Sequence, residues 1–258
     1  MKKLIVLCLI AMFAAQACME GSDVKGVYTE QMSFESFDGI KVSRFLNVKV
    51  VKGDRYEVKV NIPERYKDSL LVEVNADNNL IVKLQRNEKR AKRREKFEIE
   101  VICPSFNRIV ADAMSEVNVM SGFSFENVEL NAYALSTIFV KEQMNVKHNC
   151  KINASDLSKI ELSLEVENMV VKSSDMSTVT IIGTASTLDA KASDLSRIRC
   201  QKLIAKTVKA TAHAMSEVFV NADEKLNMDA SDMSRIRYSG SGEVAKKRTE
   251  SLSSISKR

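Results

Sequence analysis

One short sequence unit returns seven times between residues 111 and 238 of this 258-residue chain, and it restricts the possible folds more than any other feature. A clear copy is Ala192-Ser193-Asp194-Leu195-Ser196-Arg197-Ile198-Arg199-Cys200. Each copy is centred on a Leu or Met that is followed by Ser, and successive centres are 21, 22, 19, 19, 20 and 18 residues apart: Met114, Leu135, Leu157, Met176, Leu195, Met215 and Met233. A period near twenty residues is typical of a solenoid, in which each unit buries its apolar face only against its neighbours.

Small or apolar residues alternate on both sides of each centre. Before Leu195 they are Leu188, Ala190 and Ala192, and after it they are Ile198 and Cys200. Alternation by two is the period of a strand, so each repeat is predicted to hold two short strands joined at the central Asp-Leu-Ser. We expect the central Leu or Met to point inward at a corner, with the neighbouring Asp and Ser bonding the backbone of the turn.

Stacking of such strand pairs predicts an all-β fold, a right-handed parallel β-helix of about seven regular coils with like positions about 4.8 Å apart. A leucine-rich solenoid fits less well, because β-branched Val and Ile dominate and no regularly placed Asn or Cys is present. We assign residues 105–240 to the coils and residues 241–258 to a polar, loosely held C-terminal tail. Residues 24–104 are predicted to form a β region, continuous with the helix and capping its end, with about six strands and no helix: 40–42, 45–51, 56–62, 70–75, 80–85 and 97–103.

The first 18 residues resemble an export signal. Lys2 and Lys3 precede an apolar run that ends in Ala15-Gln16-Ala17-Cys18. Ala15 and Ala17 fit an ordinary signal-peptidase site, whereas a Cys after a small residue resembles a bacterial lipobox and predicts lipidation at Cys18. Both readings predict a chain that functions outside the cytoplasm, at the cell envelope or secreted, with membrane attachment only through a lipid at Cys18. Although an exported protein could use disulfides, we expect Cys103, Cys150 and Cys200 to be free and buried, since Cys150 and Cys200 lie two coils apart.

The chain resembles a known family in several places. These are Phe37-Asp38-Gly39-Ile40-Lys41-Val42, the turn at Gly53-Asp54, the apolar run into Pro104, the repeated Ser-Asp-Leu-Ser units, and the C-terminal Tyr238-Ser239-Gly240 and Ser251-Leu252-Ser253-Ser254-Ile255. This pattern is similar to the family called putative auto-transporter adhesin, head GIN domain. The resemblance implies an exported β-helical protein, frequently a lipoprotein, and it brings no catalytic residues.

The sequence itself offers little for catalysis. The two histidines, His148 and His213, lie in unrelated contexts and cannot form a catalytic triad or a His-based zinc site, and no Gly-rich phosphate loop is present. The nearest constellation is an acidic column, Asp156, Asp175, Asp194 and Asp232, that could hold Ca²⁺ on one face of a β-helix. We favour charge pairing, because Glu217 would lie between Arg197 and Arg235 in the stack. No cofactor and no metal site is therefore predicted.

The densest basic run lies between two predicted strands, from Arg86 to Lys96. Its residues Lys89, Arg90, Arg93 and Arg94 are the predicted ligand contacts, with an anionic glycan or lipid headgroup as partner. A plain solvated loop is the alternative. No aromatic residue interrupts the run, and the export signal argues against a nucleic acid partner.

Together these features predict an exported, non-enzymatic protein of the cell envelope that binds an unidentified external partner, as an adhesin does. Two alternatives remain. One is a glycan-active enzyme, such as a polysaccharide lyase, on the same scaffold. The other is a purely structural envelope protein.

Overall fold

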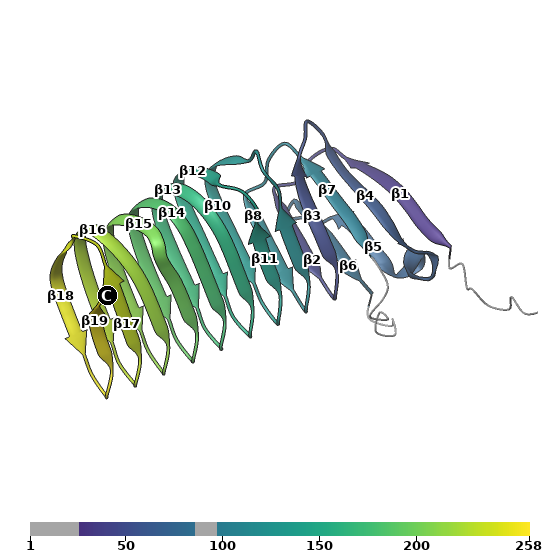
Figure 1. The fold of residues 1–258 in the computed structure, drawn as a ribbon. Coiled ribbons are helices and arrows are strands. Elements are labelled where there is room, and N and C mark those ends of the chain that lie inside the picture. Colours follow the sequence, from purple (N-terminus) through teal and green to yellow (C-terminus); the bar gives the residue numbers. More distant parts are fainter. Residues whose placement is uncertain (1–25, 86–96) are drawn as a thin grey trace, which may run out of the picture.

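The computed structural model describes residues 26–85 and 97–258. It confirms the all-β prediction: the chain is a parallel β-helix of about eight turns (Figure 1). Strands on neighbouring coils pair in parallel and keep like positions in register, as in Val179↔Ile198 and Ile198↔Val218. Each coil has one edge at which the chain reverses in a tight turn and a second edge at which it bends more gradually (Figure 1). We call these the tight-turn edge and the curved edge.

The N-terminal region contains the predicted capping strands. The coil strands β2, β3, β6 and β7 pair in parallel, whereas β1 pairs antiparallel with β4, β4 with β7 and β5 with β6, so that β1, β4 and β5 cover the end of the helix. All six predicted strands are present, and β1 is an additional one. The expectation of no helix is wrong, because a short 3-10 helix, η1, connects β4 to β5. The bounds are β1 Val27–Phe34, β2 Gly39–Ser43, β3 Asn47–Lys52, β4 Tyr56–Pro63, η1 Glu64–Ser69, β5 Leu70–Val74, β6 Asn79–Leu84 and β7 Glu98–Cys103.

The repeat region forms the regular coils. Its first coils have separate short strands before and after each turn, as predicted, but in β13 to β16 one long strand runs from each tight turn to the next. The two alternating sets therefore belong to one strand that bends at the curved edge. The bounds are β8 Arg108–Asp112, β9 Glu116–Val119, β10 Ser124–Ala132, β11 Thr137–Val140, β12 Met144–Ala154, β13 Lys159–Ser173, β14 Thr178–Ala192, β15 Arg197–Ala212, β16 Glu217–Ala230 and β17 Arg235–Ser239.

Residues 241–258 are not a loosely held tail, so that prediction needs correction. They form β18 (Glu243–Thr249) and β19 (Ser254–Lys257), which pair in parallel with β16 and β17 and add one more coil. The polar composition has a physical reason. β18 is exposed along its whole length, because only one side of this last coil has a neighbour. Ile255 is buried over Ile236 and continues the core.

The interior is filled by the two alternating sets, as predicted. Leu188, Ala190, Ala192, Ile198 and Cys200 are all at most 2% exposed. The three described cysteines, Cys103, Cys150 and Cys200, are free and buried, and burial raises the pKa of each thiol to about 12. They pack as small apolar side chains and are not poised as nucleophiles.

The central Leu or Met of each repeat does not point inward, and this prediction is wrong. Leu195 is 54% exposed and Met215 is 49% exposed, whereas the following Ser196 is 1% exposed. The reason lies in the alternation. The residues one, three and five positions after the centre form one inward set, so the Ser takes the inward position that we had given to the Leu.

Candidate functional site

The tight turns set the geometry of every surface that could bind a partner. In the repeat centred on Leu195, the Ser196 backbone N–H donates to the Ser193 carbonyl over 3.2 Å, and the two residues between them, Asp194 and Leu195, have φ of 53° and 60°. Positive φ at both central positions is the mark of a type I′ turn, which Gly, Asn and Asp favour. Nine such residue pairs occur in the described ranges, from Arg44-Phe45 to Ser251-Leu252, so the turn occurs in two more coils than the seven found from the sequence repeat.

The positive φ angles are costly for most of these residues. A non-Gly side chain in this region costs roughly 1–2 kcal/mol. The stacking of the turns offsets this cost, because the N–H of each central residue donates to the turn carbonyl of the next coil. Leu195 donates to Ala214, and Met215 to Asp232, over 2.9 and 2.8 Å. Eight bonds of this kind, 2.8 to 3.1 Å long, connect the nine turns without interruption.

The Ser after each centre fastens its coil to the preceding one. The hydroxyl of Ser196 donates to the Ser173 carbonyl over 2.7 Å, and the hydroxyl of Ser216 donates to the Ala192 carbonyl over 2.9 Å. The Ser and the Asp beside each centre were predicted to bond the backbone of their own turn. In these repeats the Ser hydroxyl instead reaches a carbonyl of the preceding coil, while Asp156 and Asp232 accept from the neighbouring seryl hydroxyls. Ser136 and Ser177 are exceptions: the buried hydroxyl of Ser136 has no hydrogen-bond partner in the described part of the chain, and that of Ser177 accepts from Ser158.

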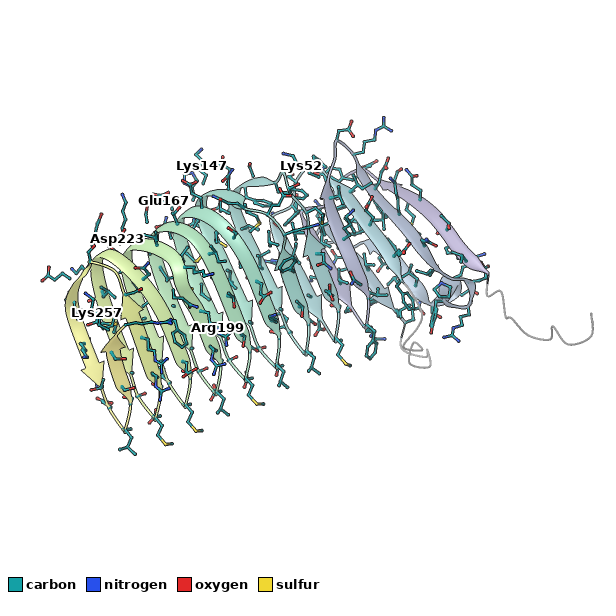
Figure 2. The ribbon with its side chains drawn as sticks, in the orientation of Figure 1. Lys52, Lys147, Glu167, Arg199, Asp223 and Lys257 are labelled. Atoms are coloured by element: carbon teal, nitrogen blue, oxygen red, sulfur yellow. The ribbon has the colours of Figure 1, made fainter. Side chains whose placement is uncertain are left out.

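The tight-turn edge carries a continuous row of exposed apolar side chains, which we call the apolar row (lower edge of Figure 2). Its members occupy the second central position of every turn and are 42–91% exposed: Phe45, Met114, Leu135, Leu157, Met176, Leu195, Met215, Met233 and Leu252. At the coil spacing of about 4.8 Å the nine side chains span about 38 Å. Seven of these residues are the repeat centres that we had predicted to point inward; Phe45 and Leu252 were not recognised as equivalent positions.

A charged column lies on each side of the apolar row. The first contains the exposed Asp156, Asp175, Asp194 and Asp232, one residue before the row, and the second contains the residues two positions after it. In the second column the predicted pairing is confirmed, because Glu217 accepts from Arg197 Nε at 2.7 Å and from Arg235 Nη1 at 3.1 Å. The four aspartates form no ion pair with any residue in ranges 26–85 and 97–258. No group of three or more His, Cys, Asp or Glu residues in those ranges could hold a metal ion.

The face formed by the strands that enter the tight turns, which we call the entry face, carries an open groove with many polar residues in its lining. This groove has a volume of about 540 Å³, and Tyr133, Asn153, Lys172, Lys191 and His213 are among its lining residues. Seryl and threonyl hydroxyls complete it, and its lining contains neither Asp nor Glu. The groove therefore offers amines, an amide, hydroxyls and one aromatic ring.

A second groove of about 480 Å³ lies on some of the same strands. Its side-chain amides form a ladder in which Asn149 Nδ2 donates to Asn127 Oδ1 over 2.7 Å. Glu129 accepts from Lys151 and Arg108, each at 3.0 Å. Partial burial favours protonation of Glu129, but the two cations outweigh this effect and lower the pKa of the carboxyl. The carboxylate is therefore ionised, and Lys151 and Arg108 compensate its negative charge.

A third groove, of about 800 Å³, lies at the curved edge near Lys147 and Glu167, which are labelled in Figure 2. Its charges compensate one another. Glu126 lies 3.3 Å from both Lys147 Nζ and His148 Nε2, and the other ring nitrogen of His148 lies 3.1 Å from Glu167. All of these side chains are exposed, so the arrangement provides neither a buried general acid nor an activated nucleophile.

Several predicted site residues lie outside the described residues. These are the lipidation candidate Cys18 and the basic ligand contacts Lys89, Arg90, Arg93 and Arg94. Within the described ranges, no helix is long and apolar enough to cross a membrane.

Comparison with known proteins gives a family and a fold. Residues 36–242 match the family described as putative auto-transporter adhesin, head GIN domain. A putative adhesin from Parabacteroides merdae ATCC 43184 superimposes with a TM-score of 0.80 at 15% identity, covering 91% of this chain and 97% of that one. A putative lipid binding protein from Parabacteroides distasonis ATCC 8503 gives 0.82 at 15% identity, over 91% and 98%. A putative adhesin from the same organism gives 0.75 at 17%, over 91% and 98%. No curated protein has a significantly similar sequence.

Proposed function

The chain belongs to the family described as putative auto-transporter adhesin, head GIN domain, and we propose that it is an exported, non-enzymatic protein of the cell envelope that binds an external partner through its entry face. The family supports an adhesin-like binding role. Export, the absence of catalysis and the class of partner are our additions. The export signal in residues 1–18 supports the first of these, and we include lipidation at Cys18 in the proposal.

The observation that carries the proposed partner class is the composition of the groove beside Lys172 and Lys191. Lys191 is partly neutralised by Asp189 at 3.1 Å, whereas Lys172 has no ion pair with any described residue. Amines, amides and hydroxyls hydrogen-bond carboxylate and hydroxyl groups of sugars, and the Tyr133 ring can stack on a sugar face. An anionic glycan fits this chemistry, and the four aspartates of the turn limit how far it can extend toward the tight-turn edge.

The test is a binding titration of the purified chain with acidic and neutral polysaccharides at several salt concentrations. We expect binding to the acidic polymers that weakens with salt. Replacing both Lys172 and Lys191 with Gln should lower the affinity and flatten the salt dependence, whereas Lys246→Gln with Lys247→Gln, on the exposed β18, is the matched control and should change neither. Equal binding by both double variants would reject the entry face as the site.

The basic segment supplies a second contact in this proposal. Replacing Lys89, Arg90, Arg93 and Arg94 with Gln should weaken binding of the same acidic polymers and reduce its salt dependence. Unchanged binding across the salt titration would return the segment to a solvated loop. Cleavage of any polymer during these incubations would instead favour the lyase alternative.

A further inference from the structure

The apolar row has no partner within the described part of the chain, although it is the most regular feature of the surface. The nine residues are 42–91% exposed, so the row presents on the order of 800 Å² of mostly apolar area in a strip about 38 Å long. Contiguous apolar patches of this size on a protein surface mark interaction sites. A partner that covers the whole row must therefore be equally long and straight.

The backbone conformation of the turn does not explain why apolar residues form the row. The second central position of these turns has a φ near 60°, as in Leu157 and Leu195, and Asn or Gly would adopt it with less strain. Nevertheless, every one of the nine positions in the described residues holds Phe, Leu or Met. Because these side chains add little to the core, their presence points to a contact outside the chain.

The two columns beside the row match each other in a particular way. In three coils an Asp lies on the entry side of the row and a cation lies on the opposite side: Asp156 with Lys159, Asp194 with Arg197, and Asp232 with Arg235. Where the column on the opposite side holds Glu, at Glu116 and Glu217, the residue on the entry side is Ala113 or Ala214. Yet these aspartates make no ion pair inside the described chain, where Lys159 pairs with Glu161 and both arginines pair with Glu217.

We propose that a second copy of this chain docks on the apolar row, with the twofold axis parallel to the β-helix. That axis brings each coil opposite the same coil of the partner subunit and exchanges the two sides of the row. Each Asp then faces the cation of the equivalent coil, and each Glu faces an Ala, so no coil opposes like charges. The antiparallel dimer would instead place the aspartate columns against each other.

The size of the strip suits such a dimer. With its two columns it is about 38 Å long and about 20 Å wide, close to the roughly 800 Å² per partner of a standard interface. A lipid surface is a poorer fit, because the four exposed aspartates would enter the headgroup region beside the row.

Sedimentation velocity of residues 19–258 over a concentration series tests the proposal. We expect a reversible dimer. Replacing Leu157, Met176 and Leu195 with Asn should weaken it by about a hundredfold or more, while Asn keeps the turn because it tolerates positive φ. The matched control is Ile182→Asn with Ile204→Asn, which removes two apolar side chains of similar exposure from the strands near the curved edge. The control should dimerise like the parent.

Two further pairs of variants test the direction of the twofold axis. Asp194→Arg and Arg197→Asp should each weaken the homodimer, yet an equimolar mixture of the two should form a heterodimer, because both contacts between them become attractive. Leu135→Cys and Met233→Cys, near opposite ends of the row, should each form a disulfide-linked homodimer, whereas an antiparallel arrangement would link neither. The three described native cysteines are buried and would not compete.

A parent chain that is monomeric at high micromolar concentration would overturn the proposal. So would a dimer that the triple Asn variant leaves intact. Co-sedimentation of a monomeric parent with phosphatidylglycerol vesicles, lost in the triple variant, would reassign the row to a lipid surface.

Discussion

The two edges of each coil solve the same problem, reversal of the chain, in opposite ways. At the tight-turn edge nine turns have the same length and the same pair of positive φ angles, and eight equivalent bonds connect each turn to the next. At the curved edge the coils differ in length, and the pairing register shifts between Phe125 and Asn127, between Val146 and Asn149, and between Arg199 and Ile204. The variation of repeat length between 18 and 22 residues is therefore absorbed at the curved edge.

This difference shows that the fold requires a constant chain length at the tight-turn edge and tolerates variation in length at the curved edge. The curved edge accepts bulges because its backbone can bend without breaking the ladder on either face. The tight-turn edge accepts none, since one extra residue would reverse the inward and outward positions of the strand that follows. The invariant edge also carries the apolar row, so its regularity serves packing inside the chain and presents a straight surface outside it.

The largest expected effect comes from placing a carboxylate at a buried position and, for comparison, at an exposed position of the same repeat. Ile198→Asp buries a carboxylate at a position with 0% exposure and should lower the free energy of unfolding by about 4 kcal/mol. Leu195→Asp, three residues earlier and half exposed, should change it by less than about 1 kcal/mol. Chemical denaturation of both variants provides the measurement, and similar losses would mean that the row contributes to the core after all.

Inserting one residue at each edge tests the contrast between them directly. A Gly between Asp194 and Leu195 should break the turn and its bonds to Met176 and Ala214, at a cost of about 3 kcal/mol. A Gly after Lys202, where β15 already bulges against β16, should cost less than about 1 kcal/mol. Thermal unfolding distinguishes the two, and equal destabilisation would remove the distinction between a strict and a tolerant edge.

Much of the fold could be predicted because the apolar alternation is strong on both sides of each repeat centre. The direction of the centre could not be assigned in this way. A Leu or Met in a predominantly apolar pattern reads as core, and only the parity of Ser196, Ile198 and Cys200 indicated that the Ser is inward and the Leu outward. Two further coils were not recognised. The turn at Phe45 has no Ser after its centre, and Leu252 is followed by Ser253 and Ile255 but is preceded by the polar, exposed β18, which lacks the apolar alternation.

The candidate surfaces were harder to predict than the fold. The sequence drew attention to charged residues, and it correctly placed Glu217 between Arg197 and Arg235. The entry-face groove is formed by residues such as Tyr133, Lys172 and His213, which are about forty residues apart and come together only when coils stack in register. Such a groove depends on the positions of side chains from several coils, and the spacing of repeats in the sequence does not give these positions.

A smaller effect distinguishes two serines of the tight-turn edge. Ser216→Ala removes the hydroxyl that donates to the Ala192 carbonyl and should cost about 1 kcal/mol. Ser136→Ala is the matched control, because that hydroxyl is buried with no partner in the described residues, and its removal should be neutral or stabilising. If denaturant midpoints fall equally in both variants, the serines act through packing and the bond between coils contributes nothing measurable.

The smallest expected effect is that of Ca²⁺ on the aspartates of the same edge. Asp156, Asp175 and Asp194 stand on successive coils about 4.8 Å apart, and the coil of Asp175 is the most favourable for a cation because Thr178 provides no positive charge there. A true site at a hundredfold excess over its Kd would add about 2.7 kcal/mol and raise the Tm by several degrees. We expect no difference between Ca²⁺ and EDTA, because single exposed carboxylates in a row do not supply the six to eight oxygen ligands that Ca²⁺ requires. A shift in Tm that disappears in Asp175→Asn would show instead that these aspartates hold a metal ion. The aspartates would then not be available to pair with the cations of a second copy of the chain.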